Sequence, residues 1–162
     1  MSAVFHQTLA IAWGKVCFCF NADGELVEIS LRTRRTVGCS GTRPAGTPSS
    51  SSLQRWVGAV EQGKAAAFPG PWRIPGDTEF RRNIYRAVAA IPAGKYLSYG
   101  EVAAQAGSPR AARAVGSAMA QNPLPLLIPC HRVWASNGLG GFTGGLKLKR
   151  AILAAEGHFL GD

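Results

Sequence analysis

The sequence predicts two domains of different class, an α/β domain in the first half of the chain and a mostly helical domain in the second half. Three observations predict this division. Residues 1–35 are β-prone with turn residues among them, the second half spaces its apolar residues as helices do, and residues 69–76 are rich in proline and glycine. We therefore expect an N-terminal domain over residues 1–76 and a C-terminal domain over residues 77–162.

The first domain is expected to begin with strands. Residues 16–20 are β-prone and residues 21–24 supply a turn. Residues 26–31 are β-prone again, with partial alternation of apolar and polar side chains, which predicts a hairpin. Residues 36–52 are rich in Gly, Ser, Thr and Pro and predict a flexible loop. Residues 53–62 carry their apolar side chains on one side, as a short helix does.

Helices dominate the second domain. Asp77 or Thr78 can cap a helix that runs to about Ala90, since apolar residues recur at helical spacing in this stretch. A short helix is then expected over residues 101–106, with Gly107 at its end.

A further helix is expected from about Pro109 to Gln121, with Ser108 as its N-cap. Together with the preceding short helix it predicts a helix-turn-helix, although a purely structural helical hairpin has the same pattern. This helix is unusual because it combines two arginines, Arg110 and Arg113, with small side chains. Small side chains permit close approach either to another part of the protein or to a narrow DNA groove.

The net charge points to an acidic partner. The chain has 18 Lys and Arg against 9 Asp and Glu, a formal net charge of +9. No carboxylate occurs from Val102 to Ala155, so this stretch would present one sign of charge if it folds compactly. Its cations are Arg110, Arg113, Arg132, Lys147, Lys149 and Arg150. Nucleic-acid binding explains this distribution, and so does a protein that is simply basic.

Composition excludes several classes of protein. Hydrophobic residues make up 46% of the chain, no run approaches about 18 consecutive apolar residues, and the N-terminus lacks a signal-peptide pattern. Cys17, Cys19, Cys39 and Cys130 lack the even spacing of a disulfide framework. We therefore expect an intracellular, reduced protein that does not cross or bind a membrane.

A cysteine beside a histidine is the candidate for chemistry. Cys130 and His131 lie in an apolar segment punctuated by prolines. A neighbouring base or cation makes a thiol nucleophilic, whereas burial alone leaves a structural cysteine inert. The two side chains would point to opposite faces of a regular strand, so contact requires an irregular backbone, which Pro129 favours.

The segment IPCHRV (residues 128–133) resembles the O6-alkylguanine-DNA alkyltransferases, also called methylated-DNA–protein-cysteine methyltransferases. The likeness covers about residues 77–159, and PCHRV at its spacing from the Tyr and Arg motifs is highly specific. Before residue 77 the likeness is weak. The other motifs that carry the resemblance are IPAGKYLSYGEVA (91–103), AARAVGSAMAQNP (111–123), Gly144-Gly145-Leu146 with Lys149, and Glu156-Gly157.

The resemblance implies roles for four residues in the chemistry. Cys130 would accept the alkyl group, and His131 would deprotonate it through a water. Glu156 would orient that histidine, in a relay of nucleophile, base and orienter. Asn122 would serve as the hinge between the recognition helix and the active-site segment.

The resemblance also implies how DNA and the lesion are bound. Arg113 would take the place of the extruded base, and Tyr99 would help rotate the nucleotide and contact that base. The carbonyl of Val133 would bind the guanine amine, and Thr143 would lie near guanine O6. The helix of small residues would read the minor groove, through Arg110, Ala112, Gly116 and Ser117.

These roles imply a direct-reversal repair protein that acts once. A group on guanine O6 is out of reach inside the duplex, so the base must be flipped, and the thioether product has no easy route back. The expected partner is double-stranded DNA containing O6-alkylguanine, with no cofactor and with the protein a monomer. The family fold implies a ribonuclease-like N-terminal domain and a winged-helix-like C-terminal domain. The expected compartment is the cytoplasm, at the nucleoid in a bacterium, or the nucleus in a eukaryote.

Two features depart from the family pattern or extend it. Phe142 stands where the family often has Tyr, which bears on the polarity of the pocket. Some relatives bind zinc in the N-terminal half, and here His6, Cys17, Cys19 and Cys39 offer four ligands. Their spacing is not that of a zinc finger, and the first two cysteines more simply share one face of a strand, so we expect no metal.

Two other functions compete with alkyl transfer. A non-catalytic protein that binds and flags alkylated DNA would share most of the motifs, but Cys130 supplies the nucleophile that such a protein does not need. A Cys-His hydrolase would use the same pair of residues, but the sequence gives no sign of an oxyanion site or an acyl pocket.

Overall fold

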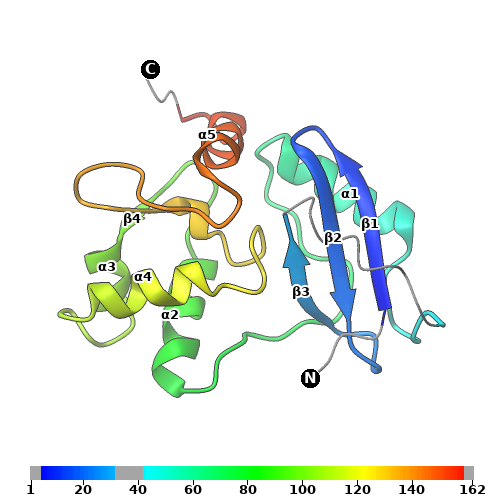
Figure 1. Ribbon diagram of the computed structural model, residues 1–162, viewed down its shortest axis with the longest axis horizontal. Helices are drawn as coiled ribbons and strands as arrows, with labels where there is room; N and C mark the ends of the chain where they lie inside the picture. Colours follow the sequence, from blue (N-terminus) through cyan, green and yellow to red (C-terminus); the bar gives the residue numbers. More distant parts are fainter. Residues whose placement is uncertain (1–4, 32–41, 159–162) are drawn as a thin grey trace. The chain divides into compact units, whose positions relative to one another are not determined.

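The computed structural model describes residues 5–31 and 42–158 (Figure 1). The chain forms two compact units, Met1–Arg73 and Ile74–Asp162. The boundary between them lies three residues before the expected one, which followed residue 76. No helix in the described part of the chain is long and apolar enough to cross a membrane.

The first unit is built on an antiparallel sheet of three strands, β1 (Phe5–Ile11), β2 (Gly14–Phe20) and β3 (Leu26–Ser30), in that order. The predicted hairpin is confirmed as β2–β3. Its turn is stabilised by Asn21, whose side-chain oxygen accepts hydrogen bonds of 3.0 Å from the backbone N–H groups of Asp23 and Glu25.

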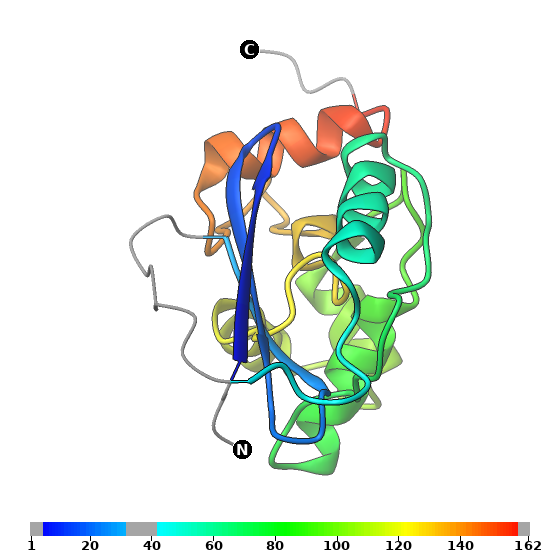
Figure 2. The same ribbon diagram turned by 90° about the vertical axis from the view of Figure 1, so that its right-hand side faces the viewer.

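Helix α1 (Ser50–Glu61) covers one face of this sheet and brings Trp56 against Phe18 (Figure 2). The predicted loop over 36–52 is therefore wrong at its end, because residues 50–52 are helical. The serine run is the N-terminus of the helix, where the Ser49 hydroxyl accepts the N–H of Ser52 at 3.1 Å. Residues 36–41 of that loop lie outside the described part of the chain.

The second unit opens with helix α2 (Glu79–Ala89), which Thr78, and not Asp77, caps by accepting the N–H of Arg81. Helix α3 (Tyr99–Gln105) follows and begins two residues before its predicted start. The reason is a capping box, in which the Ser98 hydroxyl accepts the N–H of Glu101 and the Glu101 carboxylate accepts the N–H of Ser98.

Helix α4 (Ala112–Ala120) begins three residues later than predicted, and Ser108 is not its N-cap. The Ser108 carbonyl instead accepts the N–H of Ala111 at 2.9 Å and closes a turn through Pro109 and Arg110. The fixed φ of proline suits the second position of such a turn as well as it suits a first helical turn, which explains the error.

The remaining elements of the second unit surround the candidate site. Strand β4 (Leu97–Ser98) pairs in parallel with β5 (Val133–Trp134), which directly follows the 3-10 turn η1 (Cys130–Arg132). Helix α5 (Leu146–Ala155) completes the unit. The buried apolar core around these elements includes Ile84, Val88, Val102, Val115, Ile128, Ile152 and Leu153.

Candidate active site

Cys130 lies at the start of η1, where the chain turns sharply twice. The Cys130 N–H donates to the Ile128 carbonyl at 2.7 Å across Pro129, whose φ of −75° and ψ of 69° are those of an inverse γ-turn. The Arg132 N–H then donates to the Pro129 carbonyl at 2.8 Å. The backbone is therefore irregular here, as contact between Cys130 and His131 requires.

Asn122 holds the segment that leads to the cysteine. Its side-chain N–H donates to the Ile128 carbonyl at 2.8 Å, and its oxygen accepts the Leu124 N–H at 3.0 Å. The same side chain also hydrogen bonds to the Cys130 thiol. One buried amide thus connects the end of α4 to the active-site turn, in the position expected of the hinge residue.

The side chain of His131 is oriented by a buried carboxylate. His131 Nε2 lies 2.9 Å from Glu156 Oε1, and the two side chains are 1% and 2% exposed. Because a carboxylate only accepts, Nε2 must carry the proton, and the neutral ring then has its lone pair at Nδ1. Nδ1 is buried and takes no hydrogen bond from the described protein groups, so it is the ring atom that can accept a proton.

Arg132 holds the same carboxylate from its other side, a contact that the sequence analysis missed. Its Nη2 lies 2.7 Å from Glu156 Oε1, and its Nε lies 3.1 Å from both carboxylate oxygens. Its Nη1 donates to the Ile91 carbonyl. Two consecutive residues of η1 therefore bind one carboxylate at the end of α5.

The electrostatics set the charge state of each of these groups. Burial alone would raise the pKa of Glu156, but hydrogen bonds from His131 and Arg132 outweigh burial and lower the pKa to about 2. Burial lowers the pKa of His131, so its ring is neutral at pH 7. Burial raises the pKa of Cys130, although the Asn122 hydrogen bond and the positive charge of Lys149 oppose this rise. The resting site therefore holds a thiol beside a neutral base.

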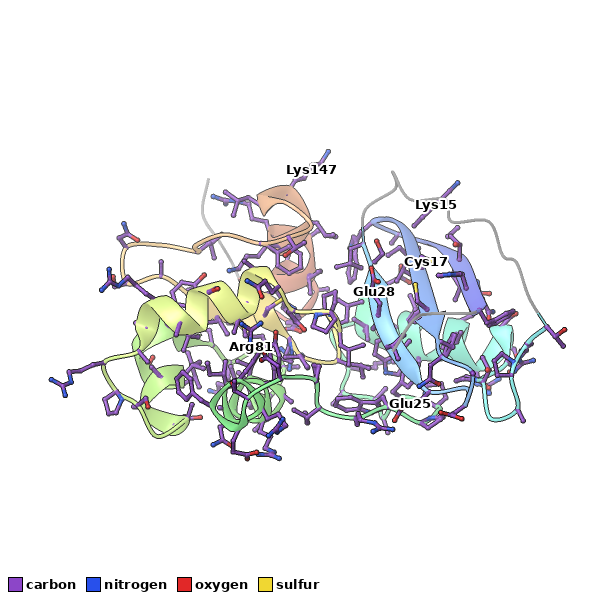
Figure 3. All side chains as sticks on the ribbon, turned by 60° about the horizontal axis from the view of Figure 1, so that its bottom comes forward. Lys15, Cys17, Glu25, Glu28, Arg81 and Lys147 are labelled. Atoms are coloured by element: carbon purple, nitrogen blue, oxygen red, sulfur yellow. The ribbon has the colours of Figure 1, made fainter. Side chains whose placement is uncertain are left out.

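Lys149 is fully buried, contrary to the expectation that it forms part of a charged surface. Its Nζ donates to the Val133 carbonyl at 2.8 Å and to the carbonyls of Leu139 and Gly141. Burial lowers the pKa of Lys149 to about 8. Lys147, two residues away on α5, is exposed and points away from the helix (Figure 3).

The one-sign surface predicted for residues 102–155 is therefore smaller than its six cations suggest. Lys149 lies inside the unit, and Arg132 is paired with Glu156. The exposed cations that remain from that set are Arg110, Arg113, Lys147 and Arg150.

The residues expected to bind the base, Tyr99, Val133 and Thr143, lie on or beside the loop between β5 and α5. Tyr99, the first residue of α3, packs so closely on this loop that a Cβ at Gly140 would lie 2.9 Å from its hydroxyl oxygen. Thr143 donates to the Ala120 carbonyl at 3.4 Å, which ties the loop to the end of α4. Val133 is buried, and its carbonyl accepts from Lys149. A carbonyl has two lone pairs, so it retains one for a further donor.

Helix α4 presents a face of small residues to its surroundings. Arg113 and Ser117 are exposed, and Ala112 and Gly116 are half-buried. A Cβ built at Gly116 would meet no atom within 4 Å. Packing against the described residues therefore does not require a glycine at this position.

Comparisons with known proteins give a consistent identification. Residues 79–158 match the family described as 6-O-methylguanine DNA methyltransferase, DNA binding domain. The methylated-DNA–protein-cysteine methyltransferase of Salmonella typhimurium is 48% identical over 137 residues, which are 84% of this chain and 77% of that protein. That of Mycolicibacterium paratuberculosis is 42% identical over 120 residues, 70% of this chain and 72% of the other.

Solved structures show the same overall fold. Mycobacterium tuberculosis OGT, solved in complex with DNA, is similar with a TM-score of 0.75 and 32% identity, over 93% of this chain and 91% of that one. An O6-methylguanine DNA methyltransferase from Methanococcus jannaschii has a TM-score of 0.70 and 26% identity, with 96% of both chains covered. The likeness therefore extends through the N-terminal unit, where the sequence motifs are weak.

Proposed function

This chain belongs to the methylated-DNA–protein-cysteine methyltransferase family, and we propose that it repairs O6-alkylguanine in DNA by transferring the alkyl group to Sγ of Cys130. The observation that carries this proposal is the buried hydrogen bond between His131 and Glu156 beside the cysteine. It fixes the tautomer in which His131 Nδ1 can accept a proton.

The reaction needs one nucleophile and one proton transfer. His131 takes the thiol proton through a water, and the Cys130 thiolate attacks the alkyl carbon in line with the bond to O6. The S–C bond forms as the C–O6 bond breaks, and guanine leaves with the electron pair of that bond. Guanine then gains one proton, which balances the proton that the thiol lost. The product is a stable thioether, so each protein molecule acts once.

The charge states of the site suit this sequence of events. The raised pKa of Cys130 keeps the resting thiol protonated, and the lowered pKa of His131 keeps its ring available as a base. Asn122 and the charge of Lys149 then stabilise the thiolate. Glu156 remains ionised and stabilises the imidazolium that forms.

Binding of the lesion is assigned to α3, α4 and the loop after β5. We propose that the small-residue face of α4 enters the minor groove, where Ala112, Gly116 and Ser117 permit close approach and Arg110 contacts phosphate. Arg113, exposed on that face, fills the space of the extruded base. Inside the pocket, the base is held by Tyr99, Thr143 and the Val133 carbonyl. Phe142 packs edge-on against His131, which makes that wall of the site apolar.

The domains suit a protein that acts alone on DNA. We propose a ribonuclease-like class for the first unit, supported by its antiparallel sheet with α1 on one face, and a winged-helix-like class for the second. We also propose that one chain, as a monomer, acts on one lesion, in the compartment that holds the DNA. Sedimentation of the protein with a lesion duplex at several ratios tests this stoichiometry.

A non-catalytic function is not favoured, since the close relatives are named methyltransferases and Cys130 is in place. The deciding experiment is intact-mass analysis after incubation with a duplex that contains O6-methylguanine. We expect a gain of about 14 Da per chain, the mass of one added methylene in nucleophilic methyl transfer, on the peptide that contains Cys130. Cys130→Ser should show no gain. Lesion binding without a mass gain, or a gain that persists in Cys130→Ser, would overturn the proposal.

A further inference from the structure

A second cluster of nucleophilic side chains belongs to the first unit, whereas Cys130 belongs to the second. His6 lies on β1, and Cys17 and Cys19 lie on β2. Their three potential ligand atoms all lie within 4.8 Å of one another, and His6 Nδ1 lies 3.0 Å from Cys19 Sγ. The alkyl-transfer site uses none of these residues.

The strand register brings the three side chains together. His6 pairs directly with Cys19 across the β1–β2 ladder, and the next pair on the same face is Thr8 with Cys17. Side chains alternate along a strand, so this face is opposite to the one where Phe18 packs on α1. Figure 3 labels Cys17 on β2. The positions of all three side chains are therefore fixed by backbone pairing and not by a mobile loop.

The spacing suits a metal ion better than a disulfide. Cysteines two residues apart in a strand have Cα atoms about 6.7 Å apart, and their parallel side chains do not reach the Cβ separation of about 4 Å that a disulfide needs. Around one zinc ion, with bonds of about 2.3 Å to sulfur and about 2.0 Å to nitrogen, neighbouring ligand atoms lie about 3.5–4 Å apart. The three ligand atoms, all within 4.8 Å of one another, are therefore close to the separations that one zinc ion requires.

The donor set selects the kind of metal. Two sulfurs and an imidazole nitrogen favour soft or borderline cations such as Zn2+ and Cu+, whereas Mg2+ and Ca2+ require oxygen ligands. Both cysteines are buried, at 7% and 5% exposure, and His6 is half-buried, so the two sulfurs are shielded from water.

We propose that His6, Cys17 and Cys19 form a binding site for one thiophilic metal ion, Zn2+ or Cu+, which links β1 to β2. The spacing of these residues along the chain is not finger-like and predicts no metal, but cross-strand pairing provides the proximity that spacing along the chain does not. Binding replaces the protons of the two thiols, so it releases up to two protons per metal.

Titration of the reduced, metal-free, full-length protein with Co2+ tests the proposal, because cobalt bound to thiolates absorbs in the near ultraviolet. We expect this absorption to saturate at one equivalent and to disappear when Zn2+ or Cu+ is added, but not when Mg2+ is added. Cys17→Ser and Cys19→Ser should each weaken binding by at least about ten-fold. Cys130→Ser is the matched control, since it removes a buried thiol of the other unit and should leave the titration unchanged.

A replacement variant and a parallel assay of alkyl transfer complete the test. If a cysteine variant does not fold by circular dichroism, His6→Gln serves instead, since it keeps both thiols and should change the cobalt spectrum. No saturable absorption in the wild type, or absorption lost in Cys130→Ser and retained in Cys17→Ser, would overturn the site. Alkyl transfer measured on the same samples separates this result from the proposed function, because each can fail without the other.

Discussion

Glu156 Oε1 accepts from both His131 Nε2, at 2.9 Å, and Arg132 Nη2, at 2.7 Å. The side chains of Glu156 and His131 are almost fully buried, and that of Arg132 is only 16% exposed. Isolated in such a site, an ionised carboxylate would be strongly destabilised, whereas here the two donors stabilise it. The arginine thus keeps Glu156 charged, and the charged carboxylate keeps His131 in the tautomer that can act as a base.

Glu156→Gln should slow alkyl transfer while Cys130 and His131 remain in place. A neutral amide orients the imidazole less firmly and stabilises the imidazolium less, so we expect a loss of about 100-fold or more, in the range of general-base effects. The single-turnover rate with free O6-benzylguanine measures it. Glu79→Gln, which removes an exposed carboxylate on α2, should leave this rate unchanged. A rate within two-fold of wild type for Glu156→Gln would argue against the relay.

Acid should destabilise the protein through Glu156 and His131. The pKa of Glu156 is about 2 in the fold against an ordinary 4.5, so its contribution is fully present above pH 4.5 and is lost as pH falls toward 2. By linkage, such a shift corresponds to roughly 3 kcal/mol. Burial lowers the pKa of His131, so stability also decreases as pH falls below 6.5.

Urea denaturation at pH 7, 5 and 3.5 measures this dependence. The wild type should lose stability at each step. Glu156→Gln should be less stable than wild type at pH 7, because it leaves Arg132 without its counter-ion, but should lose less between pH 5 and 3.5. Equal losses in the two proteins over that interval would show that another carboxylate dominates.

Much of the fold follows from local sequence signals. Thr78 caps α2 as its sequence predicts, whereas Ser49 and the Ser98–Glu101 pair are equally local caps that the predicted helix boundaries miss. Ser108 has the sequence of a cap without being one, because the Pro109 that follows it fits a β-turn and a helix start equally well.

Long-range contacts were harder to predict. The neighbours Cys130 and His131 were found from their motif, but nothing near Arg132 in sequence marks its pairing with Glu156 at the far end of α5. Lys149 could have been predicted to be buried, because its spacing to Ile152 and Leu153 places it on the apolar face of α5. The proximity of His6 to Cys19 depends on strand register, which the sequence alone leaves open.

Lys149→Met should destabilise the second unit, because three backbone carbonyls would lose their donor. Unsatisfied buried groups of this kind cost about 1–3 kcal/mol each before relaxation, so we expect a total near 3 kcal/mol in the free energy of unfolding. Hydrogen exchange should also increase over residues 134–145. Lys147→Met, on the exposed side of the same helix, is the control. Equal effects of the two changes would exclude a specific role for the buried amine.

Gly140→Ala should impair the position of Tyr99. Its new Cβ would lie 2.9 Å from the tyrosine hydroxyl oxygen, closer than such atoms approach, and its φ of +69° disfavours alanine. Gly138→Ala separates the two effects, because its φ of +148° is also unfavourable but no atom lies within 4 Å of the new Cβ. We expect both variants to lose stability and Gly140→Ala alone to lose transfer rate per folded molecule. A similar loss of rate in both would assign the effect to backbone strain.

Arg113→Ala should weaken repair of duplex DNA more than reaction with the free base. If Arg113 fills the space of the flipped nucleotide, its loss leaves the cost of unstacking, a few kcal/mol, without compensation, which corresponds to ten-fold or more in duplex repair rate. Free O6-benzylguanine needs no flipping, so its rate should be unchanged. Arg110→Ala is the matched comparison, since Arg110 is also exposed but lies in the turn before α4.

The effects of Arg110→Ala and Arg113→Ala should differ in how they depend on salt concentration and on the pairing of the lesion. As a phosphate contact, Arg110 contributes equally to every duplex, so Arg110→Ala should weaken binding uniformly and reduce the slope of log affinity against log salt by about one. Arg113→Ala should instead lose most on a well-paired lesion and least on a lesion opposite a mismatch, where unstacking costs less. Equal losses on the free base and the duplex would show that Arg113 supports the pocket and not base flipping.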